Sequence, residues 1–201
     1  MSLSSRMVIV LTAVGLLSGG FLASVGILTK DRIALNKKME IERAIVSVVP
    51  GSVATETLYE EKEFIVYGGK NKSGDLQGFA VYTTGVGFQD KIILMIGTDA
   101  SLSRLNSLVV LDQKETPGLG AKIVDRMSFL VYWENKDFTQ PFSLRKPPAP
   151  SPESLSASEV NTNTGATISS EAVLNIVNAA REKVKALREE GKLALGGTHA
   201  E

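Results

Sequence analysis

Two short segments of the sequence combine residue types that could bind a phosphorylated cofactor. The first segment, residues 164–170, reads Thr-Gly-Ala-Thr-Ile-Ser-Ser and stands where an amphipathic stretch begins. One interpretation is ordinary helix capping, in which a Thr or Ser hydroxyl accepts a hydrogen bond from an exposed backbone amide. The other is a phosphate site, because a helix start offers free N–H groups and the positive end of the helix dipole. Gly165 and Ala166 leave room for a large group, and a phosphate there could be esterified to a threonine hydroxyl.

The second segment, residues 115–120, reads Glu-Thr-Pro-Gly-Leu-Gly. Pro117-Gly118 predicts a type II turn, because proline sets φ at one central position and glycine accepts a positive φ at the next. The segment could be only a turn between elements. It could also bind a ligand, since the backbone at Gly120 can approach a flat ring closely. Polar groups that could surround such a ring are Glu115, Thr116 and Lys122.

The composition excludes several other kinds of chemistry. The chain has no cysteine, which removes disulfides, thiolate metal sites, Cys-ligated iron–sulfur clusters and Cys nucleophiles. The single histidine, His199, lies two residues from the end, where we expect it to be solvated. The 22 basic and 22 acidic residues balance, so no basic field favours nucleic acid. Redox chemistry would therefore need an organic cofactor, and no metal site or catalytic acid or base is assigned.

The N-terminal segment predicts a membrane anchor. Residues 7–29 contain no charged side chain, and as a helix they would rise ~35 Å, enough to cross the hydrocarbon core. A cleaved signal peptide is the alternative. However, the apolar run is longer than the apolar region of a usual signal peptide, and no cleavage site with two small residues separated by one follows it. We predict a retained anchor at residues 1–30. Arg6 precedes the run and four cations follow it within residues 30–38, so a charge count would keep the rest of the chain in the cytoplasm.

Residues 31–190 have the length of one domain, for which we predict an α+β fold. Residues 31–49 have helical spacing and stop at Pro50-Gly51. Short apolar or alternating runs predict strands at 63–67, 76–83, 91–96 and 105–111. The turns between them are predicted at Gly68-Gly69, Ser73-Gly74 and Gly85-x-Gly87.

The C-terminal third predicts a connector, a helix and a tail. Residues 146–153 are rich in proline and read as an exposed connector. Residues 169–190 predict a helix whose apolar stripe packs on the core, and Arg181 is among the side chains assigned to its wet face. Residues 191–201 are predicted to be a flexible tail.

The pair of motifs resembles a known family. ETPGLG, followed about fifty residues later by TGAT and Ser-Ser, is similar to the FMN-binding domain shared by the G subunit of the Rnf electron-transport complex and the C subunit of the sodium-pumping NADH:quinone reductase. The order of turns and predicted strands between the motifs is also similar. The resemblance covers roughly residues 75–180. The single N-terminal span also fits the family.

The resemblance implies roles for individual residues. In that family the last Thr of the TGAT motif carries FMN through a phosphoester bond, which falls here on Thr167. A flavin transferase makes this bond, taking FMN from FAD with Mg²⁺. The attachment would be surrounded by Thr164, Gly165 and Ala166. The flavin would be lined by Glu115, Thr116, Gly118, Leu119 and Gly120. We add Lys122, because a nearby cation could favour an anionic reduced flavin.

The implied function is electron transfer within an ion-translocating membrane oxidoreductase of the Rnf type, between ferredoxin and NAD⁺. Its partners would be membrane and iron–sulfur subunits and, during maturation, the transferase. The chain would cross the inner membrane once, with its domain on the extracytoplasmic side, against the charge count. The alternatives are the C subunit of the quinone reductase, a flavin-free membrane-tethered assembly protein, or a stand-alone extracytoplasmic flavoprotein reductase.

The sequence departs from the family pattern at three places. Asn161 stands where the family often has Asp, Gln113 stands where it commonly has His, and the proline-rich stretch is unusual. These departures bear on the efficiency of flavin attachment more than on the fold. Three aromatic side chains could stack on the ring or simply pack in the core: Tyr82, Tyr132 and Trp133.

Overall fold

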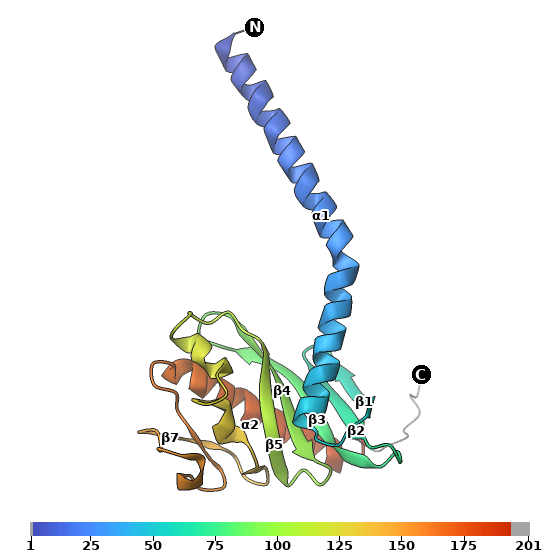
Figure 1. The fold of residues 1–201 in the computed structure, drawn as a ribbon, viewed down its shortest axis with the longest axis vertical. Coiled ribbons are helices and arrows are strands. Elements are labelled where there is room, and N and C mark those ends of the chain that lie inside the picture. Colours follow the sequence, from blue (N-terminus) through green and yellow to red (C-terminus); the bar gives the residue numbers. More distant parts are fainter. Residues whose placement is uncertain (1, 194–201) are drawn as a thin grey trace. The chain divides into compact units, whose positions relative to one another are not determined.

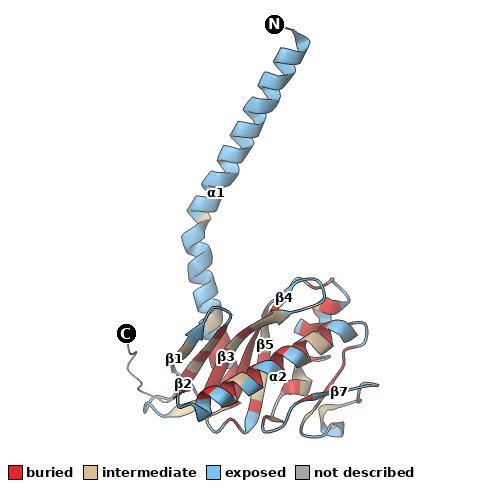
Figure 2. Ribbon diagram, turned by 180° about the vertical axis from the view of Figure 1, so that it is seen from behind, coloured by how far each residue is buried: buried red, intermediate tan, exposed pale blue. Residues whose placement is uncertain are grey.

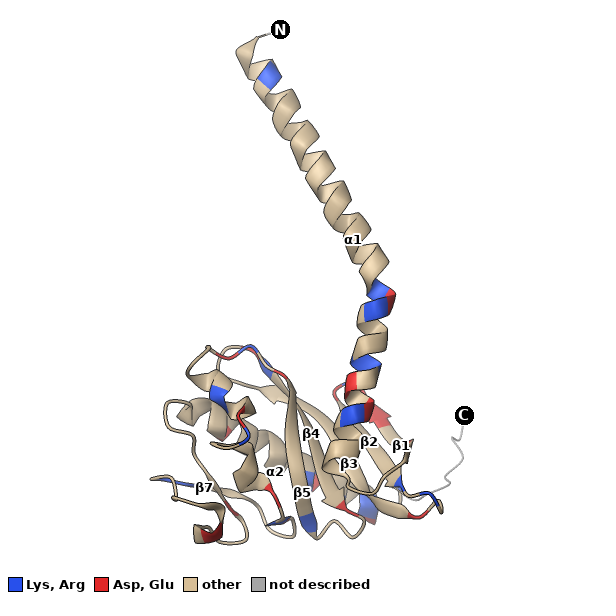
Figure 3. Cartoon of the chain, viewed as in Figure 1, with Lys and Arg blue, Asp and Glu red and all other residues tan. Residues whose placement is uncertain are grey.

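The computed structural model describes residues 2–193 and divides the chain into two compact units, Met1–Glu40 and Ile41–Glu201. His199 and most of the tail predicted at 191–201 lie outside the described residues. Helix α1, Leu3–Val48, begins in the first unit and ends in the second, so it joins the apolar run and the helix predicted after it (Figure 1). In the described part of the chain, it is the one helix long and apolar enough to cross a membrane. Its apolar stretch carries no Asp, Glu, Lys or Arg between Arg6 and Lys30 (Figure 3).

The second unit is built on an antiparallel sheet, which confirms the predicted α+β fold. Within residues 2–193 the main sheet has six strands in sequence order, β1-β2-β3-β4-β5-β6, so each strand pairs with its neighbour in the chain. Their bounds are β1 Ala54–Glu61, β2 Phe64–Lys70, β3 Leu76–Val86, β4 Lys91–Asp99, β5 Arg104–Asp112 and β6 Lys136–Asp137. Strands β2 to β5 match the four predicted runs, except that β2 begins one residue later than predicted, at Phe64. The prediction omitted β1, an edge strand whose sequence ATETLYEE is mostly polar and exposed.

Two of the predicted glycine turns are wrong. Gly68 and Gly69 lie inside β2, where they pair with Phe79 and Gly78 of β3. Gly85 lies inside β3, and the turn comes later, closed by the hydrogen bond from the Gly87 amide to the Asp90 carbonyl. These glycines allow close packing rather than chain reversal, because a Cβ at Gly85 would lie 2.2 Å from Ile176 and a Cβ at Gly69 would lie 2.9 Å from Val49.

Helix α2, Thr167–Glu189, covers one face of the sheet (Figure 2). Its predicted apolar stripe is buried against strand residues and forms the main core: Val173, Ile176, Val177, Ala180, Val184 and Leu187. The prediction that Arg181 lies on the wet face is wrong. The Arg181 side chain is buried, and its guanidinium donates to the carbonyls of Phe138, at 2.9 Å, and Thr139, at 2.5 Å. These bonds satisfy the buried charge and tie α2 to the loop after β6.

The opposite face of the sheet receives the last turns of α1. Ala44, Ile45 and Val48 are buried there with Ala80 and Met95. The backbone of α1 comes very close to β4, because a Cβ at Gly97 would lie 2.0 Å from the Val48 carbonyl oxygen. Only glycine leaves space for this contact.

The segment between β5 and α2 is held by short elements. Three 3₁₀ helices lie at Gly120–Val124, Leu130–Trp133 and Pro152–Ser154, and strand β7, Ser143–Arg145, pairs in parallel with β8, Glu159–Asn161. Trp133 is fully buried between Phe129 and Phe142, so it packs in the core.

The proline-rich segment is less exposed than predicted. Most of its side chains face solvent, but Ala149 is buried. The Asn161 amide group donates to the Ala149 carbonyl and its oxygen accepts from the Ala149 amide, both at 2.8 Å. Asn161 therefore replaces the missing strand partner of Ala149 and fixes the segment beside β8. An aspartate, which the resembled family often has here, could accept one of these bonds but, when ionised, could not donate the other.

We expect Gly97→Ala to lower the free energy of unfolding by about 1–3 kcal/mol, because the new methyl group must displace the end of α1 from the sheet. Denaturant unfolding of the full chain in detergent measures the change. Ser107→Ala, on the residue paired with Gly97 in β5, is the control and should change stability little. Equal stability of Gly97→Ala and the wild type would contradict the close contact.

We expect Asn161→Asp to destabilise the domain by about 1–3 kcal/mol at pH 7, because a buried carboxylate would face the Ala149 carbonyl oxygen. Burial raises the pKa of the new carboxyl above its ordinary value near ~3.9, so the folded state binds the proton more tightly. The penalty should be complete above the folded-state pKa and should shrink as the pH falls through it, since the protonated acid can donate. Unfolding midpoints between neutral and acidic pH measure this, with the exposed Asn175→Asp as control. A penalty that does not change with pH would contradict the role of the donated bond.

Candidate functional site

Three segments that are distant in the sequence meet at the start of α2. They are the β3–β4 turn, the 115–120 segment and residues 165–169, and together they line a cavity of about 320 Å³. The lining residues are Phe88, Glu115, Thr116, Leu119, Gly120, Gly165, Ala166, Thr167, Ile168 and Ser169. The two motifs singled out in the sequence thus form one site, although about fifty residues separate them.

The 115–120 segment forms the predicted turn. The Leu119 amide donates to the Thr116 carbonyl at 3.1 Å, and Gly118 has φ +75°, as the third position of a type II turn requires. Gly120 is buried and starts the 3₁₀ helix Gly120–Val124. The turn places Leu119, whose side chain is 53% exposed, at the edge of the cavity.

Glu115 forms part of the cavity wall, but its carboxylate is engaged inside the protein. The side chain is buried, one oxygen accepts from the amides of Phe88 and Gln89, and the other accepts from the Ser169 hydroxyl at 2.6 Å. Its own amide donates to the Gln113 side-chain oxygen at 2.6 Å. Gln113, at the position where the resembled family commonly has His, thus helps to orient the segment.

Helix α2 begins without the side-chain cap that one interpretation of TGAT predicted. Ala166 occupies the N-cap position, and Thr167 is the first helical residue. The first bond of the helix runs from the Ser170 amide to the Ala166 carbonyl at 2.8 Å. The amides of Thr167, Ile168 and Ser169 therefore have no hydrogen-bond partner among residues 2–193. The capping interpretation is wrong for Thr167, and the free amides are available to an anion.

The residues around these amides hold the helix start in place. The Ser170 hydroxyl donates to the Ala166 carbonyl at 2.8 Å and accepts from the Asn163 amide at 3.1 Å. Gly165 has φ +84°, which a residue with a side chain rarely adopts. Thr167 itself is exposed, lines the cavity, and makes no side-chain hydrogen bond within the described residues. Its hydroxyl is therefore accessible and beside three free donors.

Lys122 and Thr164 meet at the loop before α2, and a Cβ at Gly165 would lie 3.4 Å from the Lys122 ammonium. The Lys122 ammonium donates to the Thr164 carbonyl at 3.3 Å, and both residues line a second cavity of about 540 Å³. Asp125 also lines this cavity, and its pKa is lowered by hydrogen bonds from the hydroxyl and the amide of Ser128. Tyr132, one of the three aromatic side chains considered for ring stacking, also lines this second cavity. Gly118 lines neither of these two cavities.

No individual role was predicted from the sequence for three residues of the first cavity, Phe88, Ile168 and Ser169. Phe88 is 61% exposed and Ile168 is 55% exposed, so apolar side chains stand on both sides of the opening, while Ser169 holds Glu115. Their places in the sequence could have indicated them. Phe88 follows the glycine-rich turn, and Ile168 and Ser169 follow Thr167 directly. Tyr82 packs on the opposite face of the sheet, beneath the end of α1.

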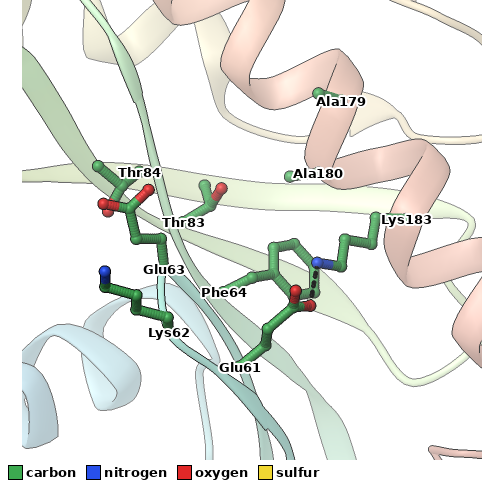
Figure 4. Close-up of a pocket in the computed structure, with 9 residues that line it drawn as sticks. All are labelled: Glu61, Lys62, Glu63, Phe64, Thr83, Thr84, Ala179, Ala180 and Lys183. Atoms are coloured by element: carbon green, nitrogen blue, oxygen red, sulfur yellow. Dashed lines mark hydrogen bonds and ion pairs between the residues drawn. The ribbon is translucent and has the colours of Figure 1, made fainter.

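A separate cavity of about 350 Å³ lies between the β1–β2 turn and the middle of α2 and contains none of the predicted site residues (Figure 4). Lys183 of α2 points across it, pairs with Glu61 at 2.5 Å and stands 4.5 Å from the centre of the Phe64 ring. The charges of Lys183 and Glu61 are therefore paired with each other within the protein.

Two curated relatives are similar to this chain, and each is named as the G subunit of an ion-translocating oxidoreductase complex. The protein from Methanosarcina acetivorans is 31% identical over 122 residues, which are 61% of this chain and 59% of the relative. The protein from Haemophilus influenzae is 30% identical over 137 residues, which are 63% of this chain and 65% of the relative. The match thus spans less than two thirds of either relative.

Two solved structures share the fold. NqrC from Shewanella oneidensis has a TM-score of 0.52 at 19% identity, with 68% of this chain and 72% of that chain covered. The C subunit of the Na(+)-translocating NADH-quinone reductase from Parabacteroides distasonis has a TM-score of 0.50 at 20% identity, with 67% and 64% covered. Residues 87–182, which contain the β3–β4 turn, both motifs and most of α2, match the family model of the FMN-binding domain. This region of the chain is therefore similar to the FMN-binding domain that its two motifs indicated.

Proposed function

We propose that this chain carries FMN covalently bound through a phosphoester to Thr167 and serves as an electron-transfer subunit of an ion-translocating oxidoreductase complex of the Rnf type. The observation that carries the proposal is the position of the Thr167 hydroxyl, which is exposed on the first residue of α2 beside the amides of Thr167, Ile168 and Ser169. The match to the FMN-binding domain and the names of the two curated relatives support it.

The start of α2 suits a phosphate ester for electrostatic reasons. The amides of the first helical turn point along the helix axis toward the N-terminal end, where the helix dipole is positive. A phosphate attached to Thr167 would accept hydrogen bonds from these amides, and Gly165 and Ala166 leave the approach free of large side chains. The Lys122 ammonium donates to the Thr164 carbonyl and would lie 3.4 Å from a Cβ at Gly165, so a positive charge stands close to this approach.

The cavity beside Thr167 suits an aromatic ring. Phe88, Leu119 and Ile168 offer apolar surface at its edge, while Thr116 contributes a hydroxyl that accepts from the Gln89 side chain at 3.2 Å. A mostly apolar wall with a few polar groups is typical of cofactor sites. When bound, FMN would supply the one- and two-electron chemistry that this cysteine-free chain lacks. The task of the protein residues is to tether and orient the ring and to shield one side of it from water.

Attachment requires a donor and an enzyme. With FAD as donor, the bond between the Thr167 oxygen and phosphorus forms while the pyrophosphate bond breaks and AMP leaves. We propose that a Mg²⁺-dependent flavin transferase makes this bond. The tether then keeps the flavin at the site at high effective concentration.

The proposal includes the place of the protein in the cell. We propose that α1 crosses the inner membrane once, that the domain lies on the extracytoplasmic side, and that membrane and iron–sulfur subunits exchange electrons with it between ferredoxin and NAD⁺. The long uncharged stretch of α1 supports the anchor. The curated relatives favour a G subunit of the Rnf type over the C subunit of the quinone reductase, since the solved structures of the latter share only the fold.

Thr167 can be tested by the mass of the intact protein. The chain produced together with a flavin transferase should gain roughly 440 Da, the mass of FMN less one water, and its denatured band should fluoresce under ultraviolet light. Thr167→Val should remain at its unmodified mass, because valine has the shape of threonine but no hydroxyl. Thr84→Val, at a threonine of β3 that does not line this cavity, is the control and should still gain the flavin.

A colourless wild type at its unmodified mass would contradict the proposal and favour the flavin-free assembly protein. A gain of mass in Thr167→Val would place the attachment elsewhere.

A further inference from the structure

We infer that Glu115 is a positioning residue, whose carboxylate holds the β3–β4 turn against the start of α2 and thereby forms the cavity between them. The inference rests on the proposed function for the meaning of the cavity. The contacts themselves belong to the chain and can be measured without any cofactor. The family resemblance implies that Glu115 lines the flavin directly, and the structure gives its oxygen atoms a different task.

The carboxylate bridges two segments that no strand pairing connects. On one side it accepts from the Phe88 amide at 2.8 Å and the Gln89 amide at 3.1 Å, both in the β3–β4 turn. On the other side it accepts from the Ser169 hydroxyl at 2.6 Å, in the first turn of α2. Glu115 itself belongs to a third segment, so one side chain joins all three walls of the cavity.

Two neighbouring glycines leave room for this carboxylate. A Cβ at Gly87 would lie 2.4 Å from one Glu115 oxygen, and a Cβ at Gly120 would lie 2.6 Å from the other. A larger residue at Gly87 or Gly120 would therefore collide with the carboxylate. Within the described residues no Lys, Arg or His forms a salt bridge with Glu115, so its buried charge is stabilised by the two amides and the hydroxyl.

The two segments that Glu115 connects carry the exposed residues of the cavity. Phe88 projects its ring to solvent from a turn, and Thr167 and Ile168 precede Ser169 on the helix. Apart from Glu115, the turn is linked to residues 114–120 by two exposed contacts, the bond from Gln89 to Thr116 and the ion pair of Asp90 with Lys114. Without the carboxylate, we expect the turn to separate from α2 and the cavity to lose its defined width.

Hydrogen–deuterium exchange of the full chain in detergent, produced without a flavin transferase, tests the inference. Glu115→Leu removes all three acceptors at similar size and should speed exchange of the Phe88 and Gln89 amides by roughly tenfold or more. Glu115→Gln keeps an oxygen for the amides but loses the charge, so its exchange should lie between Leu and wild type. Glu63→Gln, at an exposed carboxylate paired to Lys91 of β4, should leave both amides unchanged.

Exchange in the core strand β4 separates a local effect from general loss of stability and should stay as in the wild type. Wild-type exchange at Phe88 and Gln89 in Glu115→Leu would overturn the inference, as would an equal rise throughout the domain. If Glu115→Leu does not fold, Glu115→Gln decides, and unchanged exchange there would overturn it.

The flavin-loaded protein offers a second readout. Glu115→Gln and wild type should both carry the mass of FMN, but the visible circular dichroism of the bound flavin should weaken in the variant, because the ring loses a fixed surround. Identical flavin dichroism would overturn the positioning role, whereas a failure to load the wild type would bear on the proposed function alone.

Discussion

The apolar stripe of α2 must be buried against one face of the sheet, and this requirement fixes where the helix begins. Val173, Ile176 and Val177 enter the core in the first turns after Thr167, so the helix cannot slide along the sheet without exposing them. The free amides of the first turn are consequently held beside the β3–β4 turn and the 115–120 segment. Packing of the core thus sets the position of the site, although no core residue takes part in its chemistry.

Polar contacts then fix the exact positions of segments that core packing places only approximately. Burial of hydrophobic area has no strong direction, whereas a buried carboxylate must meet donors at defined distances and angles. Glu115 and Asn161 both act in this way, each satisfying backbone groups of a segment that has no strand partner there. Arg181 does the same for the loop after β6. The irregular half of the domain therefore depends on a few side chains that replace a missing ladder of backbone bonds.

Local patterns predicted much of this architecture, and the errors arose where distant residues decide. The stripe of α2, the four inner strands and the turn at Pro117-Gly118 were predictable because periodicity and turn chemistry act over a few residues. Turns predicted at Gly68, Gly69 and Gly85 are wrong because the sequence does not show the side chains that press against these glycines. Arg181 is misplaced by the sequence pattern for the same reason, since its acceptors lie about forty residues away. The resemblance to a family indicated Thr167, but only the structure shows that Phe88 lies in the cavity wall and that the Glu115 carboxylate is bonded to the turn and to α2.

Thr167 lies at the first helical position rather than at the cap, and this bears on the order of folding and the proposed flavin attachment. A capping hydroxyl would be needed to hold the helix end, and esterification would remove that support. Here Ser170, Asn163 and the backbone of Ala166 hold the end of the helix, and the Thr167 hydroxyl has no structural duty in the described chain. In the proposed attachment, the domain would therefore fold completely before modification, and a flavin transferase would receive a folded substrate whose acceptor hydroxyl is already exposed.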